Sequence, residues 1–200
     1  MTVTIKYNSE LADYSISTYA KVWAEKHGDI MEAARGSRKY GEFEGGTGFS
    51  GTKYSLPSSH GESTGLIVEG DVTYSFMPQH TFYGKIDSLA LGEELTSNPN
   101  GIGQYLSEVQ LKLSGLDISG EFDDNKSKEE NQQGEMHKSV YGLMRGNAEP
   151  MLEILKAKGI DVDVKLKDID IASQFDVMSD APEIATVGIA DDSDALLIAA

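Results

Sequence analysis

A tyrosine and a histidine that lie close together, Tyr74 and His80, are the residues whose types and spacing best suit ligand chemistry in this chain. They flank Phe76, Met77 and Pro78 within the stretch D-V-T-Y-S-F-M-P-Q-H-T-F-Y-G. A straight strand would hold Tyr74 and His80 roughly 20 Å apart. Pro78 instead favours a turn, because it fixes its own φ and disfavours helix at the residue before it. A turn at Pro78 would bring the phenol and the imidazole within hydrogen-bonding reach.

A buried phenol beside an imidazole, among apolar and thioether side chains, could serve as an anionic ligand for ferric iron, and tyrosine is a known axial ligand of haem. A free phenol has a pKa of about 10, so a phenolate at pH 7 requires stabilisation of ~4 kcal/mol, which coordination to Fe(III) can supply. A neutral His80 that accepts the phenol proton would support the ligating form, and protonation of His80 would weaken that support. An ordinary hairpin with a half-buried tyrosine and a surface histidine also fits the spacing.

The composition is that of a globular protein of one domain. The chain has 200 residues, of which 39% are hydrophobic, and its 21 glycines indicate many turns. A formal net charge of −16 argues against nucleic acid or an anionic membrane surface as a partner. The absence of cysteine excludes disulfides and thiolate metal sites. No apolar run is long enough to span a membrane. The first residues, M-T-V-T-I-K-Y, lack the apolar region of a cleavable signal peptide, which taken alone indicates a cytoplasmic protein.

The N-terminal part predicts a strand over residues 3–7, followed by a helix that begins at Ser15 or Ser17 and ends at Gly28. The apolar face of this helix would consist of Tyr19, Val22 and Trp23. Residues 29–51 form a long glycine-rich segment, here called the first loop, which is either functional or a mobile surface loop. Its candidate ligands or lid residues are Met31, Glu32, Arg35, Arg38 and Tyr40.

Sheet and helix follow in that order. Alternating apolar residues and turn signals predict strands over 53–56, 64–69, 71–76, 81–91 and 106–119, with a turn at Glu69-Gly70. Residues 123–134 are polar and charged, which indicates a loop or a disordered link. Helices are expected from Gly134 to Gly146, from a cap at Asn147 to Gly159, and over 168–175. This order predicts an α+β domain, an antiparallel sheet with helices on one face.

Several separate stretches resemble the HasA-type haemophores, secreted bacterial haem-scavenging proteins, along nearly the whole chain. They are S-I-S-T-Y-A-K-V-W-A-E-K-H-G-D-I, G-F-S-G-T-K-Y-S-L, E-G-D-V-T-Y-S-F-M-P-Q-H-T-F-Y-G-K-I-D-S-L-A-L-G and M-H-K-S-V-Y-G-L-M-R-G. The ending A-L-L-I-A-A is similar to the family's uncleaved signal for ABC-type export. The resemblance therefore implies a haem-binding domain over 1–185, an export signal over 186–200 and an extracellular location.

The resemblance implies an antiparallel curved sheet with helices on one face and a single ferric b-type haem held between two loops. Tyr74 matches the family's iron-ligating tyrosine, and His80 matches the histidine that hydrogen-bonds the phenolate. The family more often has two further residues between them. The residues that fall where the family lines its pocket are Phe49, Tyr54, Phe76, Met77, Phe82, His137, Val140, Tyr141 and Met144.

The first loop departs from the family pattern. Glu32 stands where many members have a second axial histidine, after Gly28-Asp29-Ile30. Met31 is a soft donor, whereas ferric iron beside a phenolate favours hard ones. We therefore expect Met31 to contact the haem by apolar packing and the first loop to supply no iron ligand.

The resulting expectation is a monomeric, non-enzymatic carrier. It would take haem from host haemoproteins such as haemoglobin and deliver it to a TonB-dependent outer-membrane receptor. Two alternatives remain from the residues alone. One is a haem enzyme with tyrosine ligation, as in catalase. The other is a haem-free secreted binding module, which needs only the sheet and its loops.

Overall fold

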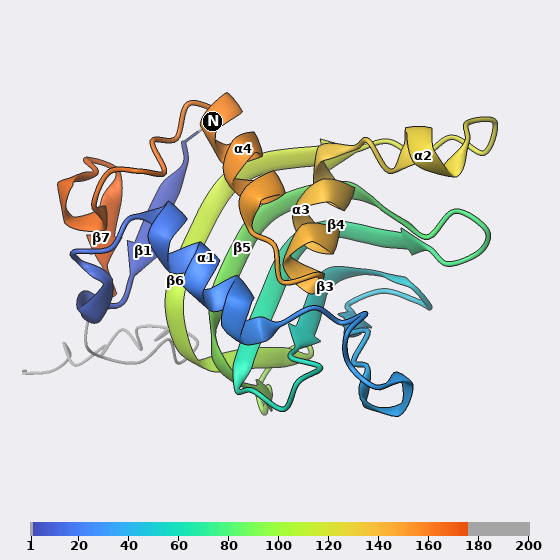
Figure 1. The fold of residues 1–200 in the computed structure, drawn as a ribbon, viewed down its shortest axis with the longest axis horizontal. Coiled ribbons are helices and arrows are strands. Elements are labelled where there is room, and N and C mark those ends of the chain that lie inside the picture. The colour runs from blue at the N-terminus through green and yellow to red at the C-terminus, as the bar shows by residue number, and fades with distance from the viewer. Residues whose placement is uncertain (1, 176–200) are drawn as a thin grey trace, which may run out of the picture.

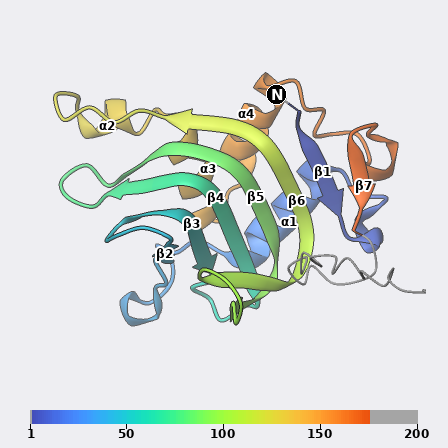
Figure 2. The ribbon, with the colours of Figure 1, turned by 180° about the vertical axis from the view of Figure 1, so that it is seen from behind.

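The sheet of the protein is strongly curved and carries its helices on one face (Figures 1 and 2). The computed structural model describes residues 2–175, so the expected export signal at 186–200 and the end of the expected domain at 185 lie outside the described residues. The strands, in the spatial order β2-β3-β4-β5-β6-β1-β7, are β2 (Glu42–Glu44), β3 (Ser50–Pro57), β4 (Thr64–Ser75), β5 (Thr81–Ser97), β6 (Gln104–Gly120), β1 (Thr4–Tyr7) and β7 (Ala172–Gln174). Neighbours are antiparallel except for the parallel pair β1/β7. The expected α+β class is confirmed.

Strand β4 runs unbroken through the place where a turn was expected. The prediction of a turn at Glu69-Gly70 is wrong, because these residues form a bulge at which the β4/β5 register shifts. Gly70 has a φ of 147°, and a Cβ there would lie 2.2 Å from the carbonyl oxygen of Lys85. The glycine thus marks a close approach of two backbones inside the sheet. Beyond the bulge, β4 continues to Tyr74 and Ser75, which pair with Phe82 and Thr81.

Helices α1 (Ile16–His27), α3 (Glu135–Met144) and α4 (Glu149–Ala157) cover the face of the sheet that is turned to the viewer in Figure 1, and the short helix α2 (Lys128–Asn131) lies beyond the end of β6. Short 3-10 turns are η1 (Ser9–Leu11), η2 (Arg35–Ser37) and η3 (Leu166–Asp168). Among residues 2–175, no helix is long and apolar enough to cross a membrane. The core lies between α1, α3, α4 and the sheet, and each fully buried Leu or Ile in it contributes about 1.5–3 kcal/mol.

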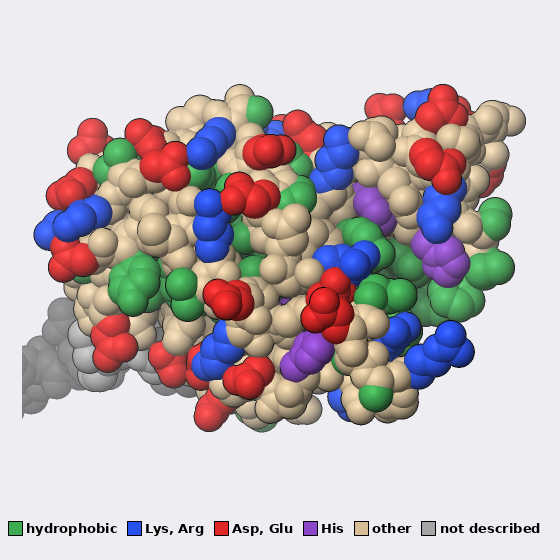
Figure 3. All heavy atoms as spheres, in the orientation of Figure 1, with side chains coloured by type: hydrophobic (Ala, Val, Ile, Leu, Met, Phe, Trp, Pro, Cys, Tyr) green, Lys and Arg blue, Asp and Glu red, His purple; other side chains and the backbone are tan. Residues whose placement is uncertain are grey.

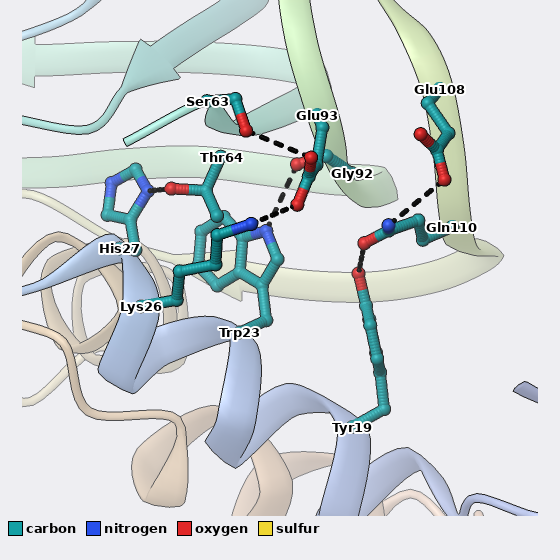
Figure 4. A network of polar contacts seen from close by, with 10 residues as sticks. All are labelled: Tyr19, Trp23, Lys26, His27, Ser63, Thr64, Gly92, Glu93, Glu108 and Gln110. Carbon is teal, nitrogen blue, oxygen red and sulfur yellow. Dashed lines mark hydrogen bonds and ion pairs between the residues drawn. The ribbon is translucent and has the colours of Figure 1, made fainter. Parts of the chain in front are cut away.

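Helix α1 begins as expected, because the hydroxyl of Ser15 accepts the amide of Thr18 in a capping box. Its inner face contains Tyr19 and Trp23, as expected, but Val22 is 57% exposed. Polar contacts fix the helix to the sheet (Figure 4). The indole of Trp23 donates to the carbonyl of Gly92 at 3.2 Å. Three further contacts between the helix and the sheet join Tyr19 to Gln110, Lys26 to Glu93, and His27 to Thr64.

Three other local expectations differ from the structure. The segment 168–175 is not a helix, because Ala172–Gln174 pairs with β1. The polar segment 123–134 contains the short helix α2 and the buried Asn131, whose amide nitrogen donates to the carbonyl of Asp123. Asn147 precedes α4 without being its N-cap residue, which is Ala148, although the side chain of Asn147 accepts the amide of Glu149.

Candidate functional site

Three segments of the chain lie at one end of the molecule in both ribbon views. They are the first loop, which includes the β2–β3 turn, the β4–β5 turn, and the segment between β6 and α3 (Figures 1 and 2). Hydrophobic side chains gather at this end, with histidine among them (Figure 3). Tyr74 lies where β4 ends, and His80 directly precedes β5.

The turn at Pro78 brings Tyr74 and His80 together, as the sequence predicts. The phenol oxygen of Tyr74 lies 3.1 Å from Nδ1 of His80. His80 has a φ of 49°, in the left-handed region, so its ring is aimed by an unusual backbone conformation. The side-chain amide of Gln132 holds that backbone, since its Nε2 donates to the carbonyls of His80 at 3.0 Å and Gln79 at 3.2 Å. The turn is therefore fixed from the β6–α3 segment.

Aromatic rings surround the phenol. The ring centroids of Tyr74 and Phe82 are 4.7 Å apart. Phe49 meets Tyr74 edge-on at 6.4 Å and stacks on Phe76 at 5.4 Å. Phe76 in turn meets the ring of His80 edge-on at 5.6 Å. The amide of Tyr74 also donates to the carbonyl of Phe49 at 2.8 Å, which ties the β2–β3 turn to the end of β4.

The predicted site residues separate into an exposed group and a buried group. Four large apolar side chains are exposed, and we call them the apolar rim. They are Phe49, Phe76, Met77 and Tyr141, which are 52%, 53%, 67% and 37% exposed. The buried residues, which support the rim from the core, are Tyr54, Phe82, His137, Val140 and Met144. Tyr74 and His80 are half-buried between the two groups. Large apolar side chains gathered on a surface are typical of a binding site.

The electrostatics favour a protonated phenol in the free protein. Burial, and then the neighbouring Tyr141 and Tyr40, raise the pKa of Tyr74 above its usual value. At neutral pH the proton therefore stays on the phenol until a cation stabilises the phenolate, and His80 is placed to accept that proton. Below the rim, Nδ1 of His137 accepts the amide of Phe82 at 3.2 Å. Burial, followed by the charge of Lys128, lowers the pKa of His137 to about 4, so its ring is neutral.

The first loop leaves its candidate ligands facing water. Met31 is 49% exposed, and Glu32 is also exposed. The guanidinium of Arg38 donates to the carbonyls of Met31 at 2.8 Å and Ala33 at 3.2 Å, so it shapes the loop from within. Just before β2 the loop is held by the buried phenol of Tyr54, which donates to the Tyr40 carbonyl at 2.7 Å.

Two contributors to the site escaped the sequence analysis. Phe43, in the short strand β2, lies 4.7 Å from Tyr54 and 6.3 Å from both Phe49 and Phe82, so it links the rim to the core. The alternation E-F-E around it was the signal that could have shown it. Gln132 lies in a polar segment whose composition gave no such signal.

This arrangement suits a flat apolar ligand that carries a hard metal ion. The rim offers aromatic surface, Tyr74 offers an oxygen donor, and His80 offers an acceptor for the proton that the donor must lose.

Comparison with known proteins also indicates a haem ligand. A family model described as "Heme-binding protein A (HasA)" matches residues 1–200. The chain is similar to "Hemophore HasA" of Serratia marcescens, with 29% identity over 194 residues, which cover 92% of this chain and 98% of that protein.

Solved structures of the hemophore HasA from Yersinia pestis match in fold as well as in sequence. An apo structure in a hexagonal crystal form is 53% identical, with a TM-score of 0.86 and coverage of 88% of this chain and 99% of that chain. A holo structure is 52% identical, with a TM-score of 0.84 and the same coverage of the two chains, 88% and 99%.

Proposed function

The chain belongs to the haem-binding protein A (HasA) family of haemophores, and from that premise we propose that Tyr74 is the side chain through which it holds the iron of haem. As a member of this family the protein is a haem-binding carrier and not an enzyme. Its cargo is haem b with ferric iron, a flat and largely apolar molecule that suits the apolar rim.

The observation that carries the proposal is the hydrogen bond between the Tyr74 phenol and Nδ1 of His80 at 3.1 Å. Ferric haem brings one net positive charge at its centre, which a single phenolate neutralises. When Tyr74 gives up its proton, His80 accepts or shares it and so keeps the phenolate available. The ring of Phe82 packs on Tyr74 and holds the phenol in place while the proton moves.

The first loop contributes apolar cover and no iron ligand. Glu32 is exposed, and burying its carboxylate opposite a phenolate would carry a large desolvation cost. Met31 is a soft donor with half of its surface in water, which suits it to packing on the ligand rather than to binding ferric iron.

The carrier acts outside the cell. The tail at 186–200, with its ending A-L-L-I-A-A, serves as the signal for an ABC-type export apparatus. The exported monomer takes haem from host haemoproteins such as haemoglobin and hands it to a TonB-dependent outer-membrane receptor. These partners rest on the family and on the tail sequence.

Titration of the purified protein with hemin, followed by absorbance of the Soret band, tests the iron ligand. Tyr74→Phe should weaken haem binding by orders of magnitude and leave the circular dichroism of the free protein unchanged. Tyr105→Phe is the matched control, because Tyr105 is a partly exposed tyrosine in β6 and outside the site. A Tyr74→Phe protein with the ferric spectrum and affinity of the unmodified chain would rule out the assignment.

His80→Ala tests the proton acceptor separately. Its effect on affinity should be smaller than that of Tyr74→Phe, because the iron ligand stays in place and only the acceptor of its proton is lost. If His80→Ala binds haem with the affinity of the unmodified protein, His80 has no role in supporting the ligand.

A further inference from the structure

We propose that Arg145 is a positioning residue for the haem site, because its one guanidinium holds both Tyr141 of the rim and Asp29, the first residue of the first loop. The inference rests on the proposed function, since Tyr141 and the first loop matter here as the surfaces that flank the haem. Arg145 itself follows α3 directly and belongs to neither surface.

The guanidinium uses separate nitrogens for its two partners. Its Nε donates to Oδ1 of Asp29 at 2.6 Å, and Nη1 donates to the phenol oxygen of Tyr141 at 3.3 Å. Oδ1 of Asp29 also accepts the amide of Met31 at 2.8 Å, so the ion pair is connected to the loop backbone two residues after Asp29. Burial alone would raise the pKa of Asp29, but the bonds from Arg145 and Met31 outweigh it and lower that pKa.

Main-chain contacts fix the part of the chain that precedes Met31 against the end of α3. Asp29 and Arg145 form an isolated antiparallel bridge, and the amide of Ile30 donates to the carbonyl of Met144 at 3.2 Å. Gly146 has a φ of 67°, and a Cβ there would lie 3.0 Å from the carbonyl carbon of Gly28. Main-chain contacts thus hold residues 28–30 without help from the Arg145 side chain.

Beyond Ile30, Arg145 acts on the amide of Met31. This amide is bonded to the Asp29 carboxylate, whose position depends on Arg145. The carbonyls of Met31 and Ala33 are held by Arg38, and the amide of Glu32 by the carbonyl of Asp29 at 3.0 Å. We therefore expect the loss of Arg145 to loosen the Met31 amide and to leave Ile30 in place.

On the other side, Arg145 orients Tyr141 within the rim. The phenol ring of Tyr141 stacks on His137, with centroids 5.1 Å apart and planes 18° apart. Stacking fixes the plane of the ring, and the hydrogen bond from Arg145 fixes where its oxygen points.

The forked shape of the guanidinium is essential to this role. Arginine presents donors in a rigid plane and can serve two acceptors at once, whereas lysine offers one point charge on a flexible stem. Arg145→Lys therefore keeps the charge beside Asp29 and gives up the bond to Tyr141.

The test compares Arg145→Gln, Arg145→Lys and Tyr141→Phe as haem-loaded proteins. Haem dissociation is followed by transfer to excess apomyoglobin. Each lost hydrogen bond corresponds to a change of roughly two- to tenfold in the rate. We expect faster release from Arg145→Gln, and we expect Tyr141→Phe to add little in the Arg145→Gln background. Lys21→Gln, which breaks the exposed ion pair of Lys21 with Glu149, is the control for losing a surface charge pair.

Amide hydrogen exchange of the free protein provides a second measurement. In Arg145→Gln the Met31 amide should exchange several-fold faster, while the Ile30 amide, held by the Met144 carbonyl, should keep its rate. A purely structural role would instead raise both rates together and lower the free energy of unfolding without changing haem release.

The outcomes separate this inference from the proposed function. If the unmodified protein binds no haem, or binds it without Tyr74, the proposed function fails. If tyrosine ligation is intact and Arg145→Gln releases haem at the unmodified rate, the positioning role is wrong. Strictly additive effects of Arg145→Gln and Tyr141→Phe would also overturn it, because the two changes should remove one shared bond.

Discussion

Lowering the pH from 7 to 5 should destabilise the free protein through two buried neutral histidines, His27 and His137. Only 2% and 4% of their surfaces are exposed. Burial lowers the pKa of His27 to about 4, with a further contribution from the nearby His60. Burial and the charge of Lys128 lower the pKa of His137 to about 4. In the unfolded chain both rings have the ordinary histidine pKa of about 6.5.

The direction of this change in the free energy of unfolding follows from which state, folded or unfolded, binds more protons. Between about pH 4 and pH 6.5 the unfolded chain is protonated at these two positions and the folded protein is not. The stability that each neutral ring contributes is therefore fully present above pH 6.5 and is lost as the pH falls toward 4. With the two pKa values given, the loss between pH 7 and pH 5 is about 2 kcal/mol for each histidine.

Urea unfolding of the free protein at pH 7 and pH 5 measures this loss. In His137→Asn the amide oxygen can take the place of Nδ1 as acceptor for Phe82, so the fold is kept while the titrating ring is removed. The loss of stability between the two pH values should then be about 2 kcal/mol smaller than in the unmodified protein. Carboxylates that titrate in the same range are common to both proteins and cancel in the difference.

The double variant His27→Asn/His137→Asn is the internal control. Its loss should be smaller by about 4 kcal/mol if the two rings titrate independently. An unchanged loss in His137→Asn would refute the reasoning, because it would mean that the ring is already protonated in the folded protein or stays neutral in both states.

Three further outcomes are expected. Ser15→Ala removes the capping hydroxyl of α1 and should lower the free energy of unfolding by about 1 kcal/mol, measured in urea; an unchanged midpoint would show that the cap contributes nothing. Tyr54→Phe removes the bond that holds the Tyr40 carbonyl and should cost about 1 kcal/mol by the same measurement, with faster proteolysis within the first loop; equal cleavage would contradict the anchoring role. Deleting residues 191–200 should abolish secretion into the medium and leave haem binding unchanged; normal secretion would disprove the export role.

Local sequence patterns were sufficient to predict those parts of the structure that depend on interactions between nearby residues. The start of the helix, expected at Ser15 or Ser17, and the inward Tyr19 and Trp23 were predictable, because a capping hydroxyl and helix spacing depend only on nearby residues. The prediction for Val22 is wrong, because its side chain faces solvent although it is apolar and lies three residues after Tyr19. The inner face at that level is instead made of the small residues Ala20 and Ala24, which let the helix approach the sheet.

The errors concern structure that depends on distant partners. Residues 172–174 have apolar neighbours that also fit a helix, and only the pairing with β1 at the other end of the chain makes them a strand. In the same way, Gly70 could mark either a turn or a bulge, and the register against β5 decides for the bulge.

The candidate site shows the same division. The meeting of Tyr74 with His80 depends on a short turn and was predictable from Pro78. Two other contacts join segments far apart in the sequence, and no periodic pattern predicts them. They are the bond from Gln132 to the carbonyl of His80 and the ion pair of Asp29 with Arg145.

The pairing of β7 with β1 determines when the fold can be finished. Until residues 172–174 have been synthesised, the outer edge of β1 presents unpaired backbone groups, and pairing across such a long intervening chain is slow to form. At roughly 5–20 residues per second, residues 175–200 follow within about 5 s. On the proposed role of 186–200, strand β7 and the export signal therefore become available almost simultaneously. Recognition by the export apparatus then competes in time with completion of the sheet in the same newly made molecule.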